Sequence, residues 1–186
     1  MSDTSTPHTA LLERIRNRSA RVGVIGLGYV GLPLAMTAAR AGFPVTGFDI
    51  DPSKIVSIDA GKSYIEAVPD AVLSEFTGGR RFMATTDFAE LADCDVIVIC
   101  VPTPLTKHRD PDLSFVTRTG QSIAKSLRPG QLVVLESTTY PGTTDGVVRP
   151  ILEETGLKSG ATSSSASRRS ARIPAISIII PPPSRR

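Results

Sequence analysis

Residues 22–35 read VGVIGLGYVGLPLA, and this stretch decides the fold class of the chain. A β-branched run over residues 21–25 stops at glycine, as buried strands do. Helix-forming residues follow over 29–41 and end at Gly42, a common stop for a helix. Pro33 falls in the first turn of this helix, where a missing N–H is tolerated. The stretch therefore predicts a strand, a glycine-rich turn and a helix.

The turn carries glycines at the spacing GxGxxG, formed by Gly26, Gly28 and Gly31. This spacing is weak alone, but here it follows a predicted strand and opens a predicted helix. In such turns the first glycine permits the tight bend, the second lets a diphosphate approach the backbone, and the third lets helix and strand pack closely. The helix N-terminus offers free N–H groups to the phosphates. The turn predicts a dinucleotide-binding site.

An acidic residue ends the next predicted strand, which covers residues 44–50. Asp49 lies 21 residues after the second glycine of the turn, where an acid is expected to bond the ribose hydroxyls. The neighbouring Asp51 fits a helix cap better. The phosphate that NADP adds would lie beside Asp49, and each like-charge pair at ~4 Å costs up to about 4 kcal/mol at an intermediate dielectric. We therefore expect NAD rather than NADP as the cofactor, with Lys54 near the adenosine ribose or in solvent.

The chain up to residue 159 alternates between helical and strand patterns. We expect helices over residues 10–18, 52–60, 67–76, 87–91, 114–127 and 143–155, and strands over 81–84, 95–101 and 131–135. This alternation predicts a parallel sheet with helices on both faces. We therefore expect a Rossmann-type, doubly wound α/β domain over residues 20–159, preceded by a helical extension over residues 1–19.

Two loops follow predicted strands at the carboxyl edge of this sheet, where open α/β sheets bind their ligands. Residues 101–105 read VPTPL, with two prolines and the hydroxyl of Thr103; a rigid turn without ligand contact is the alternative. Residues 136–143 read ESTTYPGT. Their hydroxyls can bond a nicotinamide ribose or hold a water molecule, but they can equally cap a helix, Thr143 in particular.

The two cysteines predict no disulfide, metal site or nucleophile. No CxxC pair or histidine cluster accompanies Cys94 and Cys100. Cys100 lies in a predicted buried strand, and Cys94 is flanked by Asp93 and Asp95, whose carboxylates raise the pKa of a thiol. We therefore expect a reduced, cytoplasmic protein with no metal and no catalytic nucleophile in this chain.

The composition, 40% apolar and 21% charged, is typical of a soluble globular protein, and no apolar run approaches the ~20 residues that span a bilayer. The net charge of +3 is unevenly placed. Residues 160–186 hold five arginines and no acid, which leaves −2 for the rest of the chain. The basicity therefore belongs to the tail, and we expect neither nucleic acid nor a membrane as a partner.

Residues 160–186 consist almost entirely of Ser, Arg, Ile, Ala and Pro. Such a low-complexity segment buries too little apolar surface to offset its ordering entropy, so we expect disorder, although residues 176–180 could pair as an isolated strand. Two interpretations compete: a natural disordered basic tail, or translation in the wrong reading frame after about residue 159. We favour the second.

Together, residues 22–35, the VPTPL loop and the stretch from EST to TYPGTT resemble the UDP-glucose/GDP-mannose dehydrogenase family. The segment GKSYIE (61–66) and residues 106–113 resemble its branch that oxidises UDP-N-acetyl-hexosamines. The resemblance covers residues 20–159. It implies an NAD-dependent nucleotide-sugar 6-dehydrogenase of the UDP-N-acetyl-glucosamine type, which supplies precursors of surface polysaccharides. In this family two hydride transfers to two NAD molecules, through a thiohemiacetal on a cysteine, turn the C6 hydroxyl into a carboxylate.

The resemblance also implies which residues line the cofactor. The glycine turn would hold the diphosphate, Asp49 the adenosine ribose with Lys54 beside it, and the two loops the rest of NAD, with Thr138 near the catalytic water. The full set is Gly26, Leu27, Gly28, Tyr29, Val30, Gly31, Asp49, Lys54, Val101, Pro102, Thr103, Pro104, Leu105, Ser137, Thr138 and Thr139.

Beyond residue 159 the chain departs from the family pattern. The Gly-rich segment with the catalytic cysteine, the Pro-Glu that supplies the catalytic glutamate, and the helical and sugar-binding regions that follow are not found in this sequence. A frameshift would explain these departures together. We therefore expect a truncated cofactor-binding fragment that turns over no nucleotide sugar, and the homo-oligomer of the family is not predicted for it. The alternatives are a β-hydroxyacid dehydrogenase, against which both loops argue, and a non-catalytic NAD-binding module.

Overall fold

The computed structural model of the chain describes residues 7–79, 81–106, 110–157, 160–161 and 176–179, the last two segments as backbone alone. The elements, in chain order, are α1 (Pro7–Arg16), β1 (Val22–Ile25), α2 (Gly31–Arg40), β2 (Val45–Phe48), α3 (Pro52–Asp59), α4 (Asp70–Gly78), β3 (Phe82–Thr85), η1 (Phe88–Asp93), β4 (Val96–Ile99), α5 (Ser114–Ser126), β5 (Leu132–Leu135), η2 (Thr144–Val148), α6 (Arg149–Glu153), β6 (Gly160–Ala161) and β7 (Ile176–Ile179).

Five parallel strands form the main part of the sheet, in the order β3-β2-β1-β4-β5. Val22 of β1 lies opposite Val45 of β2 on one side and Val96 of β4 on the other. The chain runs outward from β1 in one direction and then returns to continue from β4 in the other. A crevice therefore opens between β1 and β4 at the carboxyl ends of the strands. This topology confirms the predicted Rossmann-type α/β fold.

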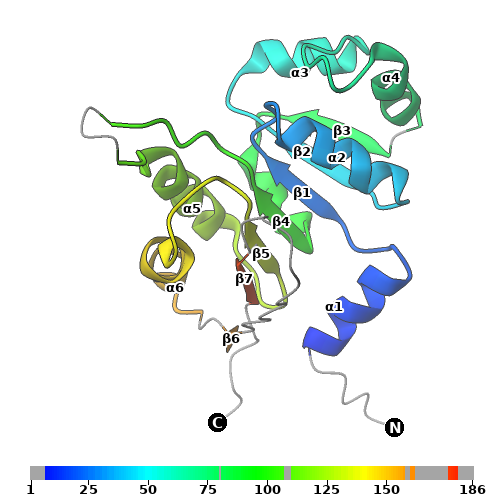
Figure 1. Cartoon of the computed structure of the whole chain (residues 1–186). Coiled ribbons are helices and arrows are strands. Elements are labelled where there is room, and N and C mark those ends of the chain that lie inside the picture. The colour runs from blue at the N-terminus through cyan, green and yellow to red at the C-terminus, as the bar shows by residue number, and fades with distance from the viewer. Residues whose placement is uncertain (1–6, 80, 107–109, 158–159, 162–175, 180–186) are drawn as a thin grey trace, which may run out of the picture.

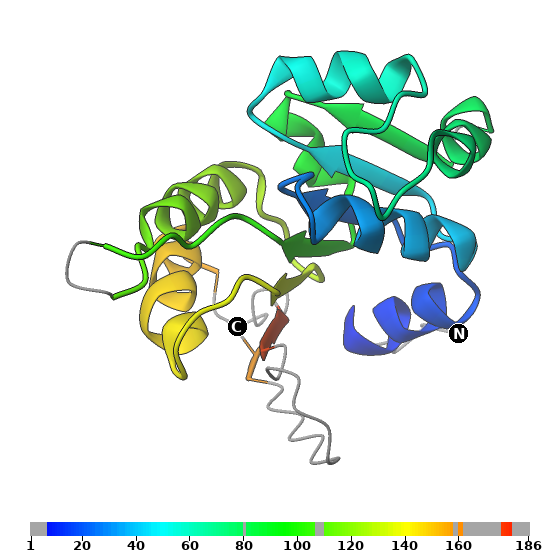
Figure 2. The ribbon, with the colours of Figure 1, turned by 45° about the horizontal axis from the view of Figure 1, so that its top comes forward.

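Helices cover both faces of the sheet (Figures 1 and 2). On one face, a hydrophobic cluster joins α2 and α4 to the sheet, and on the other a second cluster joins α5 and α6 to it. Strand β4 contributes to both, since Val98 belongs to the first cluster while Ile97 and Ile99 belong to the second. Such alternation is expected for a strand that is buried on both faces.

The predicted helices are present, but two of them differ in type. Residues 87–91 correspond to the 3₁₀ helix η1, and the last helix begins as the π-helical turn η2 before it continues as α6. The prediction that Thr143 caps this helix through its side chain was wrong. Its backbone is already helical (φ −57°, ψ −39°), and its hydroxyl donates to Tyr140 O at 2.8 Å. Asp51 does cap α3, since its carboxylate accepts from Ser53 N at 2.9 Å.

Two antiparallel strands extend the sheet beyond β5. Strand β7 pairs with β5, with Ile179 opposite Leu132, and β6 pairs with β7. The segment over residues 176–180 that could form a strand thus does so over Ile176–Ile179, at the side of the sheet away from β3. The disorder expected for the remainder of residues 160–186 concerns positions outside the described residues.

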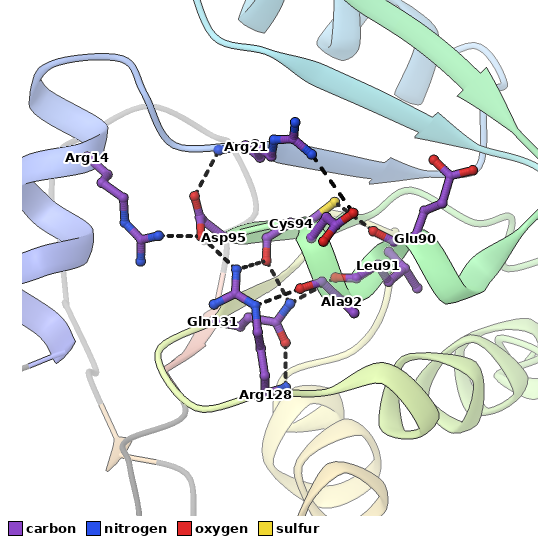
Figure 3. Close-up of polar contacts among 10 residues, drawn as sticks. Arg14, Arg21, Glu90, Leu91, Ala92, Cys94, Asp95, Arg128 and Gln131 are labelled. Atoms are coloured by element: carbon purple, nitrogen blue, oxygen red, sulfur yellow. Dashed lines mark hydrogen bonds and ion pairs between the residues drawn. The ribbon is translucent and has the colours of Figure 1, made fainter.

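Asp95 joins the N-terminal helix to the sheet (Figure 3). Its buried carboxylate accepts from Arg14 Nη1 and Arg128 Nη2, both at 2.8 Å, and from Arg21 N at 3.0 Å. Arg128 also donates to the carbonyl oxygens of Ala92 and Cys94. Helix α1, the start of β1, the start of β4 and the turn before β5 therefore meet at the amino edge of the sheet, opposite the glycine turn.

Both cysteines are free and buried. The pKa of each thiol is raised to about 12, mainly by burial and to a lesser extent by carboxylates, which are Asp93 and Asp95 at Cys94 and Glu136 at Cys100. The predicted direction at Cys94 is confirmed, although burial is the larger cause. Within the described residues, no helix is long and apolar enough to cross a membrane, and no group of three or more His, Cys, Asp or Glu side chains could hold a metal ion.

Candidate cofactor-binding site

The glycine turn follows β1 and leads into α2, and its three glycines play different parts. Gly26 has φ +90°, and a Cβ there would lie 2.7 Å from Cys100 O, directly after β4. A Cβ on Gly31 would collide with the carbonyl oxygen of Gly26. A Cβ on Gly28 would meet nothing within 4 Å. Gly26 and Gly31 are therefore required by the fold, whereas Gly28 leaves one face of the turn open to a ligand.

The N-terminus of α2 is open at this same place. Val30, at the N-cap position, makes no side-chain cap hydrogen bond, and Tyr29 and Val30 are exposed. In the described part of the chain, no group accepts a hydrogen bond from Gly28 N–H. Free N–H groups at a helix N-terminus attract an anion such as a phosphate. The turn can thus bind the diphosphate of a dinucleotide.

The carboxylate of Asp49 lies beside the turn, at the end of β2. Its Oδ2 accepts from Leu27 N at 2.8 Å and from Lys54 Nζ at 2.7 Å, and its Oδ1 accepts from Asp51 N at 3.0 Å. The side chain of Asp49 is 6% exposed and that of Lys54 30%. A carboxylate has about four acceptor positions, so roughly one is still available. The acid predicted to bind a ribose is therefore in place, and Lys54 contacts it directly.

A pocket of about 510 Å³ opens next to Asp49. Its walls come from the ends of β1, β2 and β4, from the segment after β3, and from one side of α5. The lining residues are Ile25, Gly26, Phe48, Asp49, Ile50, Lys54, Thr86, Asp87, Phe88, Ala89, Val101, Pro102, Phe115, Arg118, Thr119, Ser122, Lys125 and Ser126. The residues after β3 and on α5 are absent from the set predicted from sequence. The residues after β3 directly follow a strand at the carboxyl edge, which was the signal that could have identified them, whereas no such local signal marks the residues on α5.

The two loops predicted to line the cofactor, residues 101–105 and 136–143, lie together, because a side-chain hydroxyl of each donates to a backbone carbonyl of the other. Ser137 Oγ donates to Val101 O at 2.8 Å, and Thr103 Oγ1 donates to Thr138 O at 2.6 Å. The hydroxyl protons of Ser137 and Thr103 are thus used to join the loops. Thr138 is exposed and Thr139 half-buried, so their hydroxyls are the ones left for a ligand.

The far end of the first loop turns away from this arrangement. Leu105 is 68% exposed and forms an antiparallel bridge with Pro111. Pro102, by contrast, lines the pocket, and Val101 contacts both the pocket and Ser137. The structure therefore brings the start of the VPTPL loop to the crevice, while its last residue lies outside the pocket lining.

The glycine turn, the acid at the end of β2 and the two joined loops are found together in the region that one family model matches. The model of the NAD binding domain of the UDP-glucose/GDP-mannose dehydrogenase family matches residues 20–167. The chain belongs to this family. NAD is accordingly the cofactor of this unit, as the acid at position 49 predicts. The family assignment also favours this interpretation over a β-hydroxyacid dehydrogenase.

Relatives within the family differ in the sugar that their names give. The chain is 36% identical over 142 residues to UDP-N-acetyl-D-glucosamine 6-dehydrogenase of Pseudomonas aeruginosa, covering 76% of this chain and 33% of the relative. It is 39% identical over 141 residues to UDP-N-acetyl-D-mannosamine dehydrogenase of Pyrococcus horikoshii, covering 75% and 34%. The crystal structure of a ternary complex of GDP-mannose dehydrogenase from Pseudomonas aeruginosa superimposes with a TM-score of 0.70 at 36% identity, over 74% of this chain and 33% of that one. This member of the nucleotide-sugar dehydrogenase family thus spans about a third of the length of its relatives.

Proposed function

We propose that this chain is the cofactor-binding unit of an NAD-dependent nucleotide-sugar 6-dehydrogenase of the UDP-N-acetyl-glucosamine type, which acts in the cytoplasm on the path to surface polysaccharides. The observation that carries the proposal is the Asp49 carboxylate, held 2.8 Å from Leu27 N of the glycine turn and facing a pocket of about 510 Å³. This arrangement supports the proposal, because an acid suited to a ribose lies between a turn suited to phosphates and a cavity large enough for a base.

The residues fit the parts of NAD in order along the crevice. The free N–H of Gly28 and the open N-terminus of α2 suit the diphosphate. Asp49 suits the adenosine ribose. Its carboxylate has about one acceptor position free, so it can accept hydrogen bonds from both ribose hydroxyls only if Lys54 Nζ releases its hydrogen bond to Oδ2. The pocket suits adenine, because Ile50, Phe88 and Phe115 provide apolar walls for a flat ring.

At the other end of the crevice, the joined loops suit the nicotinamide ribose. Thr138 and Thr139 offer hydroxyls there, and Thr138 is the residue we assign to the neighbourhood of the catalytic water. NAD supplies the chemistry when bound, by accepting hydride from the C6 carbon of the sugar. Among the described residues, buried thiols with pKa values raised to about 12 are poor nucleophiles, so this unit binds and orients the cofactor and does not attack the sugar.

Titration calorimetry with NAD tests the binding site. We expect saturable binding of NAD, weaker binding of NADP, and a loss of about tenfold or more in NAD affinity for Asp49→Asn, since a hydrogen bond to a charged group contributes about 1.5–3 kcal/mol. Asp51→Asn is the matched control. It removes the neighbouring acid, whose carboxylate caps α3, and should change the affinity much less. Equal affinity of Asp49→Asn and the unaltered protein would contradict the assignment.

Absorbance at 340 nm tests the catalytic part of the proposal. With NAD and UDP-N-acetyl-glucosamine, the chain alone should form no NADH, because it spans about a third of the length of its relatives and supplies no activated nucleophile for the second oxidation. Steady NADH formation would show that this chain oxidises the sugar by itself and would overturn that part. The chain can also be mixed with the remaining domains of a relative, NAD and nucleotide sugars. If NAD then binds but no NADH forms, a non-catalytic NAD-binding module is favoured.

A further inference from the structure

The peptide groups of Leu27, inside the glycine turn, are held from both sides. Leu27 N–H donates to Asp49 Oδ2 at 2.8 Å, and Leu27 C=O accepts from the hydroxyl of Tyr64 at 2.8 Å. The Leu27 side chain is fully buried, and it fits against Gly47, where a Cβ would lie 2.8 Å from Leu27 Cδ2. The turn therefore cannot rotate at this residue without breaking a hydrogen bond or a packed contact.

The carbonyl that Tyr64 holds belongs to the same peptide unit as the N–H of Gly28. In a planar trans peptide these two groups point in opposite directions. A hydroxyl that fixes the Leu27 carbonyl on one side of the turn therefore fixes the Gly28 N–H on the other side. Among the described residues nothing accepts a hydrogen bond from that N–H, and a Cβ on Gly28 would meet nothing within 4 Å.

Tyr64 itself is well anchored, although it lies in the loop between α3 and α4. The preceding Ser63 donates from its backbone N–H to Asp70 Oδ1 at 2.8 Å, and its hydroxyl accepts from Ile65 N at 3.1 Å. Ile65 and Val68 are buried in the cluster that includes Leu27, and Tyr64 packs against the same cluster. The position of the hydroxyl is thus set by the core and not by a mobile surface group.

We propose that Tyr64 is a positioning residue for the cofactor, which aims the Gly28 N–H at the diphosphate by holding the Leu27 carbonyl. The proposal rests on the function proposed above and assigns a role to a loop that lies outside the glycine turn in sequence. Burial and the carboxylates Asp49 and Asp51 raise the pKa of Tyr64, so its hydroxyl stays a donor throughout the neutral and mildly alkaline range. The effect of Tyr64 on affinity should therefore be constant between about pH 6 and pH 9.

The experiment compares Tyr64→Phe with the unaltered protein by calorimetry, using ligands with and without a diphosphate. The substitution keeps the ring and removes only the hydroxyl. We expect NAD and ADP-ribose to bind about fivefold more weakly, the effect of a single hydrogen bond of about 1 kcal/mol, and adenosine to bind equally well. Thr155→Val is the matched control, because it also removes a hydroxyl that donates to a backbone carbonyl, that of Leu152 at 2.7 Å, at a position just after α6 that does not line the pocket; it should leave all three affinities unchanged.

The outcomes separate this inference from the proposed function. Failure of the unaltered protein to bind NAD would remove both. Binding of NAD with the same ADP-ribose affinity in Tyr64→Phe would overturn the role of Tyr64 and leave the NAD site standing. An equal loss for adenosine would also overturn it, since the tyrosine would then act on the whole domain.

A second measurement uses the unaltered protein, so it does not depend on the stability of the variant. The amide resonance of Gly28 in a ¹⁵N–¹H spectrum should move downfield with ADP-ribose and stay in place with adenosine, because only the former brings an acceptor to this N–H. Absence of a shift with ADP-ribose would overturn the inference.

Discussion

Replacing Asp95 by asparagine should weaken the fold without touching the cofactor site. The Asp95 carboxylate accepts hydrogen bonds from two guanidinium groups and one backbone N–H (Figure 3). The neutral amide of asparagine removes the negative charge from both ion pairs, and its NH₂ group cannot accept the hydrogen bonds that these groups donate. Breaking a fully buried ion pair costs about 3–5 kcal/mol. Here Arg14 and Arg128 are 39% and 35% exposed, so solvent screens both pairs. We expect a loss of roughly 2–3 kcal/mol in the free energy of unfolding.

Urea denaturation measures this loss. For a slope of about 1–3 kcal/mol per molar urea, the midpoint should fall by roughly 1 M or more. The matched control is Asp93→Asn, two residues away. Asp93 Oδ2 lies 4.0 Å from Arg21 Nη1 with both side chains well exposed (72% and 62%), so its loss should be close to zero.

The two variants decide the reasoning about Asp95. A midpoint for Asp95→Asn equal to that for Asp93→Asn would refute the view that the buried carboxylate ties α1 to the sheet. A double-mutant cycle with Arg14→Ala should show coupling between residues 14 and 95, because they share one hydrogen bond. The NAD affinity of the folded fraction should be unchanged in each case, since the cofactor site lies at the opposite edge of the sheet.

The glycine turn and the cysteines give three further expectations. Gly31→Ala should lower the free energy of unfolding by about 1–3 kcal/mol or more, because its Cβ collides with the Gly26 carbonyl. Gly28→Ala should leave the melting temperature unchanged and weaken NAD binding. Equal melting temperatures for the two variants would contradict these different roles. Cys94 and Cys100 should react with a disulfide reagent at pH 8 far more slowly in native protein than in urea, and fast labelling of the native protein would show that they are accessible. Both thiol pKa values are raised from 9.0 to about 12 in the folded protein, so the unfolded chain loses these protons at lower pH. The free energy of unfolding should therefore fall as pH rises from about 9 toward 12. It should fall less steeply in a variant that carries both Cys94→Ala and Cys100→Ala.

The sequence predicted the parallel α/β fold because its strands are apolar runs that end at glycine or at a polar loop. The spacing from the glycine turn is set by one helix and one strand, and the structure has Asp49 beside that turn at the end of β2; its role toward the ribose stays a prediction. Boundaries and helix types were less accurate. Thr143 was assigned as a cap from its residue type alone, but only the backbone angles decide whether a helix has already begun there.

The contacts that the sequence did not predict join residues far apart in the chain. Asp95 meets Arg14 and Arg128 at separations of 81 and 33 residues, and each of these residues alone is typical of a solvated surface. Tyr64 meets Leu27 across 37 residues. Such pairs depend on how the helices pack on the sheet, which no local pattern contains.

The ion pair between Arg14 and Asp95 has a consequence for where this domain begins. The family model matches the chain from residue 20, yet Arg14 and the buried Leu11 lie before that residue. A protein that began at residue 20 would keep only one of the two guanidinium groups that bind the Asp95 carboxylate. It would also expose the apolar surface that Leu11 covers. The folded unit therefore extends, at its N-terminal side, beyond the residues that the family model matches, and α1 belongs to it.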